Sequence, residues 1–244
     1  MIKFFRKIRF DLMGQNKRSK YIKYAIGEIV LVVIGILIAL SISNWNQKQL
    51  EKKQIRNIYA RIIQDFNHTA AEIEAGLTSM ESRSIFMDDI LKGNVVRDSL
   101  VTNDLYFQKY KSSFLGYPDI QINETGMRLL ESKIELNYEL NTELTEALTL
   151  LYSEHIFEYK IDETSISYYF QNVYDYCIRK GVFLDYRIHN NKTKFVNLIF
   201  EDDTFKSYLL VYNNTHSTYK NRLKSFKTKG ALLIDKIKKE FDLE

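Results

Sequence analysis

Histidines and carboxylates at helical spacing are the residues of this chain that could bind a metal or move protons. Asp65 precedes His68 by three positions, and His155 precedes Glu158 in the reverse order. A carboxylate-bridged di-metal site in a helical bundle needs two Glu-x-x-His pairs and two further inward glutamates. The chain offers no second forward pair, so we expect no metal site and no bound cofactor.

A second polar group lies on helix faces that are otherwise apolar. His155, Tyr159 and Asp162 share one stripe, and His216 lies on a comparable stripe near the end of the chain. Buried polar groups need partners, so these four residues are candidates for a hydrogen-bonded network or for the lining of a small ligand cavity. The alternative is that residues 162–165 break the helix, with Asp162 as a solvent-accessible N-cap.

Local motifs for catalysis are absent from the sequence. It has no His-Glu-x-x-His, no phosphate-binding glycine loop and no Gly-x-Ser-x-Gly. Its one cysteine, Cys177, can form neither an intrachain disulfide nor a thiolate metal site, and a buried core residue is its simplest role. We therefore predict a protein without enzymatic activity, although distant residues can assemble a site that leaves no local motif.

Aromatic residues are dense between Tyr152 and Tyr186, where they occupy ten of 35 positions. This density is typical of packing between helices, and also of a groove for a ligand or a protein partner. The sequence leaves both interpretations open.

The net charge of +4 is unevenly distributed along the 244 residues. Residues 1–45 carry eight basic and two acidic groups, so the remainder has a net charge of −2. A nucleic-acid-binding domain needs positive charge on the folded part that contacts phosphates. The distribution therefore argues against a nucleic-acid partner.

One apolar segment predicts a transmembrane helix over residues 24–45. Between Ala25 and Ser43 the one ionisable residue is Glu28, and 19 helical residues cover about 28 Å, the thickness of the hydrocarbon core. Glu28 is expected at the cytoplasmic boundary and Trp45 at the outer one. A cleaved export signal is usually shorter, and a soluble core helix would show a polar face.

The residues around this segment predict its orientation and contacts. The excess of basic residues in 1–23 places the N-terminus in the cytoplasm, and this part is expected to lie on membrane lipid as a basic amphipathic segment. Within the span, small residues recur at intervals of four or eight positions, which favours close approach of a second helix and a homo-oligomer. They are Gly27, Gly35, Ala39 and Ser43.

The remaining residues, 46–244, are expected to form an extracytoplasmic all-α domain. One proline and nine glycines leave little material for tight turns and favour long helices. Apolar residues at a 3.6-residue period predict three of these, ending at Leu91, running from an Asn141 cap to Lys180, and running from Asp202 to Phe241. The first is expected to continue the span without a break. Together they predict an elongated bundle of three long helices plus shorter ones.

Shorter elements are expected between the first two long helices. Asp98 is a candidate cap for a helix through Ser112, residues 115–119 form a strong turn signal, and another helix is expected over 124–133.

The N-terminal sequence carries a family resemblance. The runs Met1–Arg9, Lys20–Tyr21, Tyr24–Leu40 and Asn44–Asn46 together resemble the start of an uncharacterised family of single-span membrane proteins from Bacteroidota. Residues 125–130 resemble that family's short mid-chain helix. The resemblance covers about residues 1–60 and implies an anchor in the inner membrane of a bacterium, with no known activity.

These features favour a membrane-anchored periplasmic module that binds a protein partner or helps to assemble an envelope complex. The alternative is a ligand-sensing periplasmic domain that signals through the span. Because only about 24 residues precede the span, such a sensor would need a separate transducer.

Overall fold

The computed structural model describes residues 18–117, 120–136 and 142–243, which form helices and connecting segments without a β-strand. The chain divides into two compact units, Met1–Arg56 and Asn57–Glu244. The helices are α2 (Arg18–Lys92), α3 (Arg97–Thr102), α4 (Asp104–Phe114), α5 (Thr125–Leu136), α6 (Glu143–Arg179), α7 (Val182–Ile188), α8 (Thr193–Glu201) and α9 (Asp203–Phe241). The predicted all-α fold is confirmed.

The described part of the first unit is the N-terminal portion of α2. Its apolar side chains from Ile29 to Leu40 are all exposed. Among the described residues, α2 is the one helix with a stretch long and apolar enough to cross a membrane. The predicted continuation of this stretch into the first long helix is confirmed, because α2 has no break between Arg18 and Lys92. The first 17 residues, predicted to be amphipathic, lie outside the described part.

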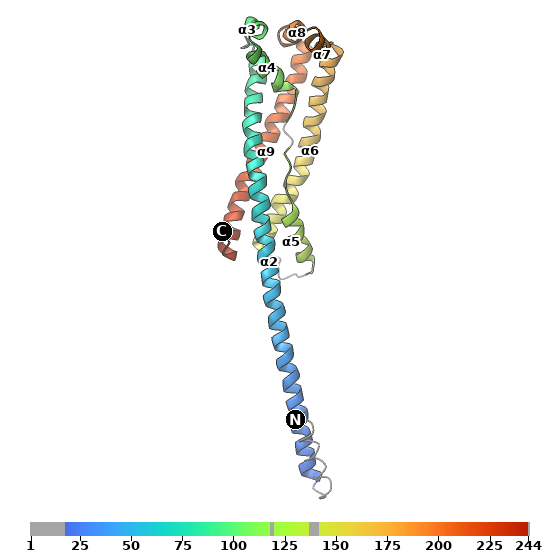
Figure 1. Cartoon of the computed structure of the whole chain (residues 1–244), viewed down its shortest axis with the longest axis vertical. Helices are drawn as coiled ribbons and strands as arrows, with labels where there is room; N and C mark the ends of the chain where they lie inside the picture. Colours follow the sequence, from blue (N-terminus) through green and yellow to red (C-terminus); the bar gives the residue numbers. More distant parts are fainter. Residues whose placement is uncertain (1–17, 118–119, 137–141, 244) are drawn as a thin grey trace. The chain divides into compact units, whose positions relative to one another are not determined.

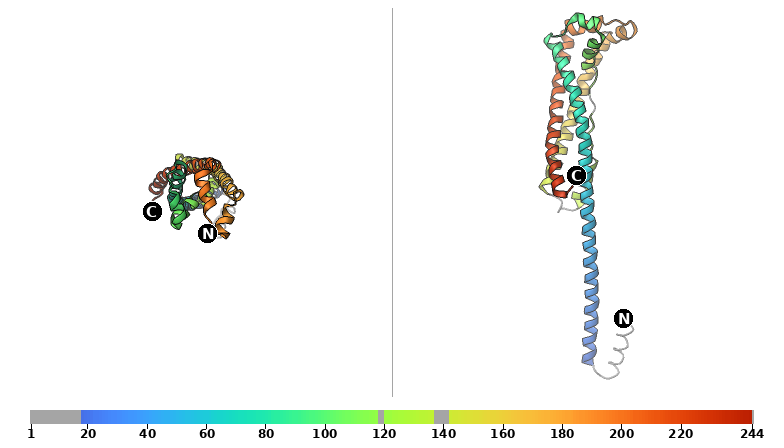
Figure 2. Two further views of the ribbon diagram at one scale, coloured as in Figure 1. Left: turned by 90° about the horizontal axis from the view of Figure 1, so that it is seen from above. Right: turned by 60° about the vertical axis from the view of Figure 1, so that its left-hand side comes forward.

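The second unit is a bundle of three long helices: residues 57–92 of α2, α6 and α9. Figure 1 shows α6 and α9 running side by side, and Figure 2 shows α9 beside this part of α2 as well. Each helix contributes side chains to one core at the predicted apolar positions. The fully buried ones include Ile62, Ile73, Met80, Met87, Val173, Cys177, Phe205, Leu209, Leu223 and Ile237.

Four short helices, α3, α4, α7 and α8, lie together at one end of the bundle (Figure 1). The ring of Phe195 from α8 lies at their centre, 5.7 Å from that of Phe107 and 5.8 Å from those of Phe183 and Tyr186. Helices α7 and α8 were not predicted, because helices of seven and nine residues are too short for a clear apolar period. Much of the aromatic density near residue 186 therefore belongs to packing.

The segment after α4 is held by two of the long helices. Arg83 of α2 donates hydrogen bonds to the carbonyl oxygens of Ser112 and Gly116, both at 2.6 Å. Tyr212 of α9 donates a third, of 2.9 Å, to Gly116. These contacts hold the start of the segment, whose described residues 115–117 are neither helix nor strand.

Several predicted helix ends need correction. The single helix from Asp98 to Ser112 is wrong, because the chain is extended at Asn103, whose side chain accepts from Tyr106 N and caps α4. Asn141 lies outside the described residues, and α6 is capped by Thr142, whose hydroxyl accepts from Thr145 N. By contrast, α9 begins where predicted, and Asp202 caps it by accepting a hydrogen bond from Phe205 N.

The interpretation of Asp162 as an N-cap is also wrong. Helix α6 continues through this position without a break from Glu143 to Arg179. Asp162 is 5% exposed. Its carboxylate is accommodated by a cation from α9 rather than by the start of a helix.

Candidate binding groove

A groove runs between α6 and α9 along the outside of the bundle. Three adjoining pockets of about 400, 570 and 480 Å³ follow one another along it, and neighbouring pockets share lining residues. The first two share Leu151, Glu154 and Lys229. The second and third share Ala147, Leu233, Lys236 and Lys239. We refer to this feature, lined by residues 142–158 and 218–240, as the α6/α9 groove.

The middle of the α6/α9 groove is apolar. Leu144 and Leu151 are buried, while Ala147 and Leu233 are half-buried between the two helices. Leu150 on one lip is 57% exposed and Leu232 on the other is 63% exposed. Leucines exposed on both lips leave apolar surface in water that a partner could cover.

The two sides of the groove carry opposite charge. Helix α6 contributes three carboxylates and no permanent cation, from Glu143, Glu154 and Glu158. Helix α9 contributes four cations and two carboxylates, from Arg222, Lys229, Asp235, Lys236, Lys239 and Glu240. An elongated ligand in the groove would therefore meet an acidic side and a mainly basic side.

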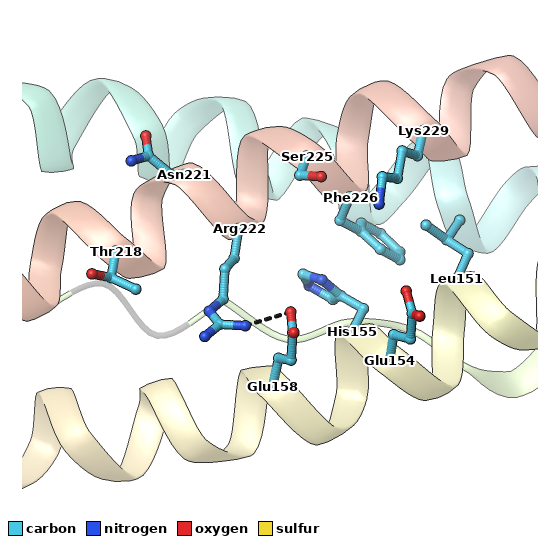
Figure 3. Close-up of a pocket in the computed structure, with 10 residues that line it drawn as sticks. All are labelled: Leu151, Glu154, His155, Glu158, Thr218, Asn221, Arg222, Ser225, Phe226 and Lys229. Carbon is cyan, nitrogen blue, oxygen red and sulfur yellow. Dashed lines mark ion pairs between the residues drawn. The ribbon is translucent and has the colours of Figure 1, made fainter.

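Arg222 joins α9 to α6 near one end of the groove. Its Nη1 forms an ion pair with Glu158 (Figure 3). Its Nε lies 2.7 Å from Asp162 Oδ2. The Arg222 hydrogen bond lowers the pKa of the Glu158 carboxyl, whereas burial raises the pKa of Asp162 against the opposing charge of Arg222. The guanidinium is thus largely neutralised within the protein.

His155 lies at the floor of the same end. Its ring stacks on that of Phe226, with 4.2 Å between centroids and 29° between planes (Figure 3). Burial lowers the pKa of His155 to about 4, with Glu158 opposing and Arg222 adding to the shift, so the ring is neutral at pH 7. A neutral stacked ring serves packing better than acid–base chemistry at this pH.

The predicted polar candidates are only partly brought together. His155 and Asp162 both lie near Arg222, whereas the side chain of Tyr159 lies outside the described residues. His216 lies apart from them, fully buried, with its ring centroid 5.9 Å from that of Tyr212. In the described part of the chain, neither ring nitrogen of His216 has a hydrogen-bond partner.

Sequence reasoning missed Arg222 and the groove itself. The available signal was a second stripe on α9, beside the core stripe, at alternating spacings of four and three residues: Thr218, Arg222, Ser225, Lys229, Leu232, Lys236 and Lys239. Because most of these residues are polar, a search for apolar periodicity does not find them.

The predicted membrane residues all lie in the first unit. Gly35, Ala39 and Ser43 are exposed, and a Cβ added at Gly27 or Gly35 would meet no atom within 4 Å. Glu28 is half-buried and Trp45 is 64% exposed. No described metal-binding group of three or more His, Cys, Asp or Glu residues is found in either unit.

The N-terminal part of the chain matches the model of one known family. Residues 28–109 match the model of a family of unknown function (DUF6090). The resemblance to an uncharacterised family is thereby confirmed over these residues. No curated protein and no solved structure matches the chain.

The DUF6090 match covers most of the apolar helix, the bundle portion of α2, α3 and about half of α4. It contains Glu28 and Trp45 but ends before α6 and α9. The α6/α9 groove is therefore built entirely from residues outside the DUF6090 match, and its role has to be argued from its own geometry.

Proposed function

We propose that this protein is a membrane-anchored helical module that binds a protein partner, without catalytic activity of its own. The observation that carries the proposal is the α6/α9 groove, where exposed Leu150 and Leu232 flank an apolar floor. Exposed apolar patches rimmed by polar residues are typical of interaction sites. Assembly of an envelope complex is one way in which such a module would act.

The anchor in this proposal is the apolar stretch of α2, inserted once into the inner membrane of a bacterium. Its exposed side chains from Ile29 to Leu40 are suited to contact with lipid tails. The basic residues before the stretch favour a cytoplasmic N-terminus, which puts the bundle in the periplasm.

A ligand-sensing role receives less support from the groove. At the Arg222 end of the groove, a site for a small anion would need an available cation, but Arg222 is already paired with Glu158 and Asp162. The neutral stacked ring of His155 offers no charge either. A surface for a protein partner fits the exposed leucines better.

The proposed topology can be tested with single cysteines and a membrane-impermeant maleimide on cells with a permeabilised outer membrane. The native Cys177 is a silent background, since it is fully buried and burial raises its pKa to about 12. Val101→Cys, at a 54% exposed position, should label, whereas Ser19→Cys should label only after the inner membrane is broken. The reverse pattern would contradict the orientation.

Partner binding is tested by chemical cross-linking of the full chain in its native membrane. We expect a reproducible cross-link between the bundle and another protein that persists at native expression level. A chain that cross-links to no other protein across several reagents would overturn the proposed function.

A further inference from the structure

We infer that the α6/α9 groove accepts one amphipathic helix of a partner protein. The acidic side chains of this partner helix lie along α9, and its basic side chains lie along α6. This inference rests on the proposed function and specifies the chemistry of the partner. It is carried by the spacing, the charge and the length of the groove.

The spacing of the lining residues favours a helix as the occupant. On α6 the residues facing the groove are separated by three and four positions in turn, through Leu144, Ala147, Leu151, Glu154 and Glu158. On α9 the same alternation runs through Arg222, Ser225, Lys229, Leu232, Lys236 and Lys239. The two stripes lie side by side and share this 3.5-residue period. Together they present the holes into which side chains of a third helix pack.

The charges determine which helix fits. A partner helix laid on the apolar floor has one flank beside Lys229, Lys236 and Lys239 and the other beside Glu143 and Glu154. Acidic residues on the first flank and basic residues on the second would each meet the opposite charge, whereas a helix with two like-charged flanks would be repelled on one side. The groove therefore selects a helix with two differently charged flanks.

The groove also limits the length of the helix. From Glu143 to Glu158 the rise of α6 amounts to about 22 Å, which corresponds to about four turns of an occupant. Beyond that point the ion pairs of Arg222 with Glu158 and Asp162 join the two sides. A segment of about 15 residues with Leu-like side chains at i, i+3, i+4 and i+7 fills this space.

Site-specific photo-cross-linking of the full chain in its native membrane tests the inference. A photoreactive amino acid replaces Leu232 or Leu150 and, as the matched control, Leu105, which is 76% exposed but lies on α4. We expect at least tenfold more cross-linked product at the two groove positions than at Leu105. Mapping by mass spectrometry should place the cross-link in an amphipathic helical segment of another protein, with one acidic and one basic flank.

A charge variant provides a second measurement. Lys229→Glu combined with Lys236→Glu should lower the cross-linking yield at Leu232 at least fivefold. Lys224→Glu, a single charge reversal at an exposed position of α9 on the side that borders α2, should leave the yield unchanged. Equal losses in the two variants would contradict a role for the groove charges.

The remaining outcomes separate the inference from the proposed function. A cross-link from the groove to a lipid, to a second copy of this chain or to a segment without charged flanks would overturn the inference. A protein partner captured equally at Leu105 and Leu232 would also overturn it, while leaving the proposed function in place. No protein captured at any of the three positions would count against both.

Discussion

Asp65 of α2 accepts a hydrogen bond of 2.7 Å from the backbone N–H of Gly126, the second residue of α5. The same carboxylate lies 2.9 Å from Arg61 Nε and is 2% exposed. A side chain from one helix thus satisfies an N–H at the start of another, which an N-cap residue normally does from within the same helix. This contact fixes where α5 lies on α2.

Replacing Asp65 should therefore destabilise the bundle. Asp65→Ala leaves a buried N–H without its acceptor and should lower the free energy of unfolding by about 2 kcal/mol. Thermal or denaturant unfolding of the full chain in detergent measures this loss. Glu72→Ala, at an exposed position of α2, should change stability by less than about 0.5 kcal/mol, and an equal effect would contradict the assigned role.

Gly126 is the next test of this junction, because α5 comes unusually close to α2 there. A Cβ at Gly126 would lie 2.7 Å from the backbone nitrogen of Ile62, which has no room to shift. Gly126→Ala should cost about 1–3 kcal/mol of stability despite the better helix propensity of alanine. Gly35→Ala, where a Cβ meets open space, should leave the unfolding of the bundle unchanged.

The Arg222 bridge should contribute measurably to stability. Arg222→Leu leaves the buried Asp162 carboxylate without its cation, and we expect a loss of about 2 kcal/mol. This is below the value for a fully buried pair, since the Arg222 side chain is 32% exposed. Adding Asp162→Leu should recover part of the loss. Lys227→Leu, which breaks a more exposed pair with Glu74, should cost less than about 1 kcal/mol.

His216 should make stability depend on pH. Burial lowers its pKa from 6.5 to about 4, with Arg83 and Lys220 adding to the shift, so the unfolded chain binds the proton more tightly. Stability is therefore greatest above pH 6.5 and falls as the pH drops towards 4, by about 1.4 kcal/mol per pH unit for this group. His216→Leu should remove the contribution of one proton to the slope of stability against pH, measured by unfolding at several pH values. His68→Gln, at an exposed position, should leave that slope unchanged.

The small residues of the apolar helix provide a separate prediction. If two copies associate through the membrane segment, Gly35→Ile with Ala39→Ile should abolish association in a membrane two-hybrid assay, because the backbones can no longer approach. Unchanged association of the double variant would contradict self-association through this helix face. Leu31→Val is a suitable control of similar hydrophobicity.

The architecture was largely predictable because three long helices each carry a clear apolar period. Residues such as Phe66, Leu148 and Leu209 lie on those stripes and are buried in the structure. Their period is a local property of the sequence, so it can be found without knowledge of the partners. The ends of shorter helices were less predictable, because Asp98 and Asn103 are both good caps and only the tertiary packing selects Asn103.

The candidate site was harder to predict, since it depends on pairs far apart in the sequence. The polar stripe on α6 pointed to His155 and Asp162, but nothing local indicates that Arg222, 60 positions beyond Asp162, completes the group. A comparable stripe on α9 suggested His216 as a member, although it lies elsewhere in the core beside Tyr212. Helical periodicity gives the face of a residue and not its neighbour across the bundle.

The double hydrogen bond on the Gly116 carbonyl has a consequence for how this chain can tolerate insertions. Loops usually accept extra residues, but Gly116 O must reach both Arg83 and Tyr212. One residue inserted between Phe114 and Gly116 would displace that oxygen by up to about 3.8 Å and break at least one of the two bonds. The start of this connection is therefore a spacer of fixed length, although residues 115–117, which the structure describes, contain no helix or strand.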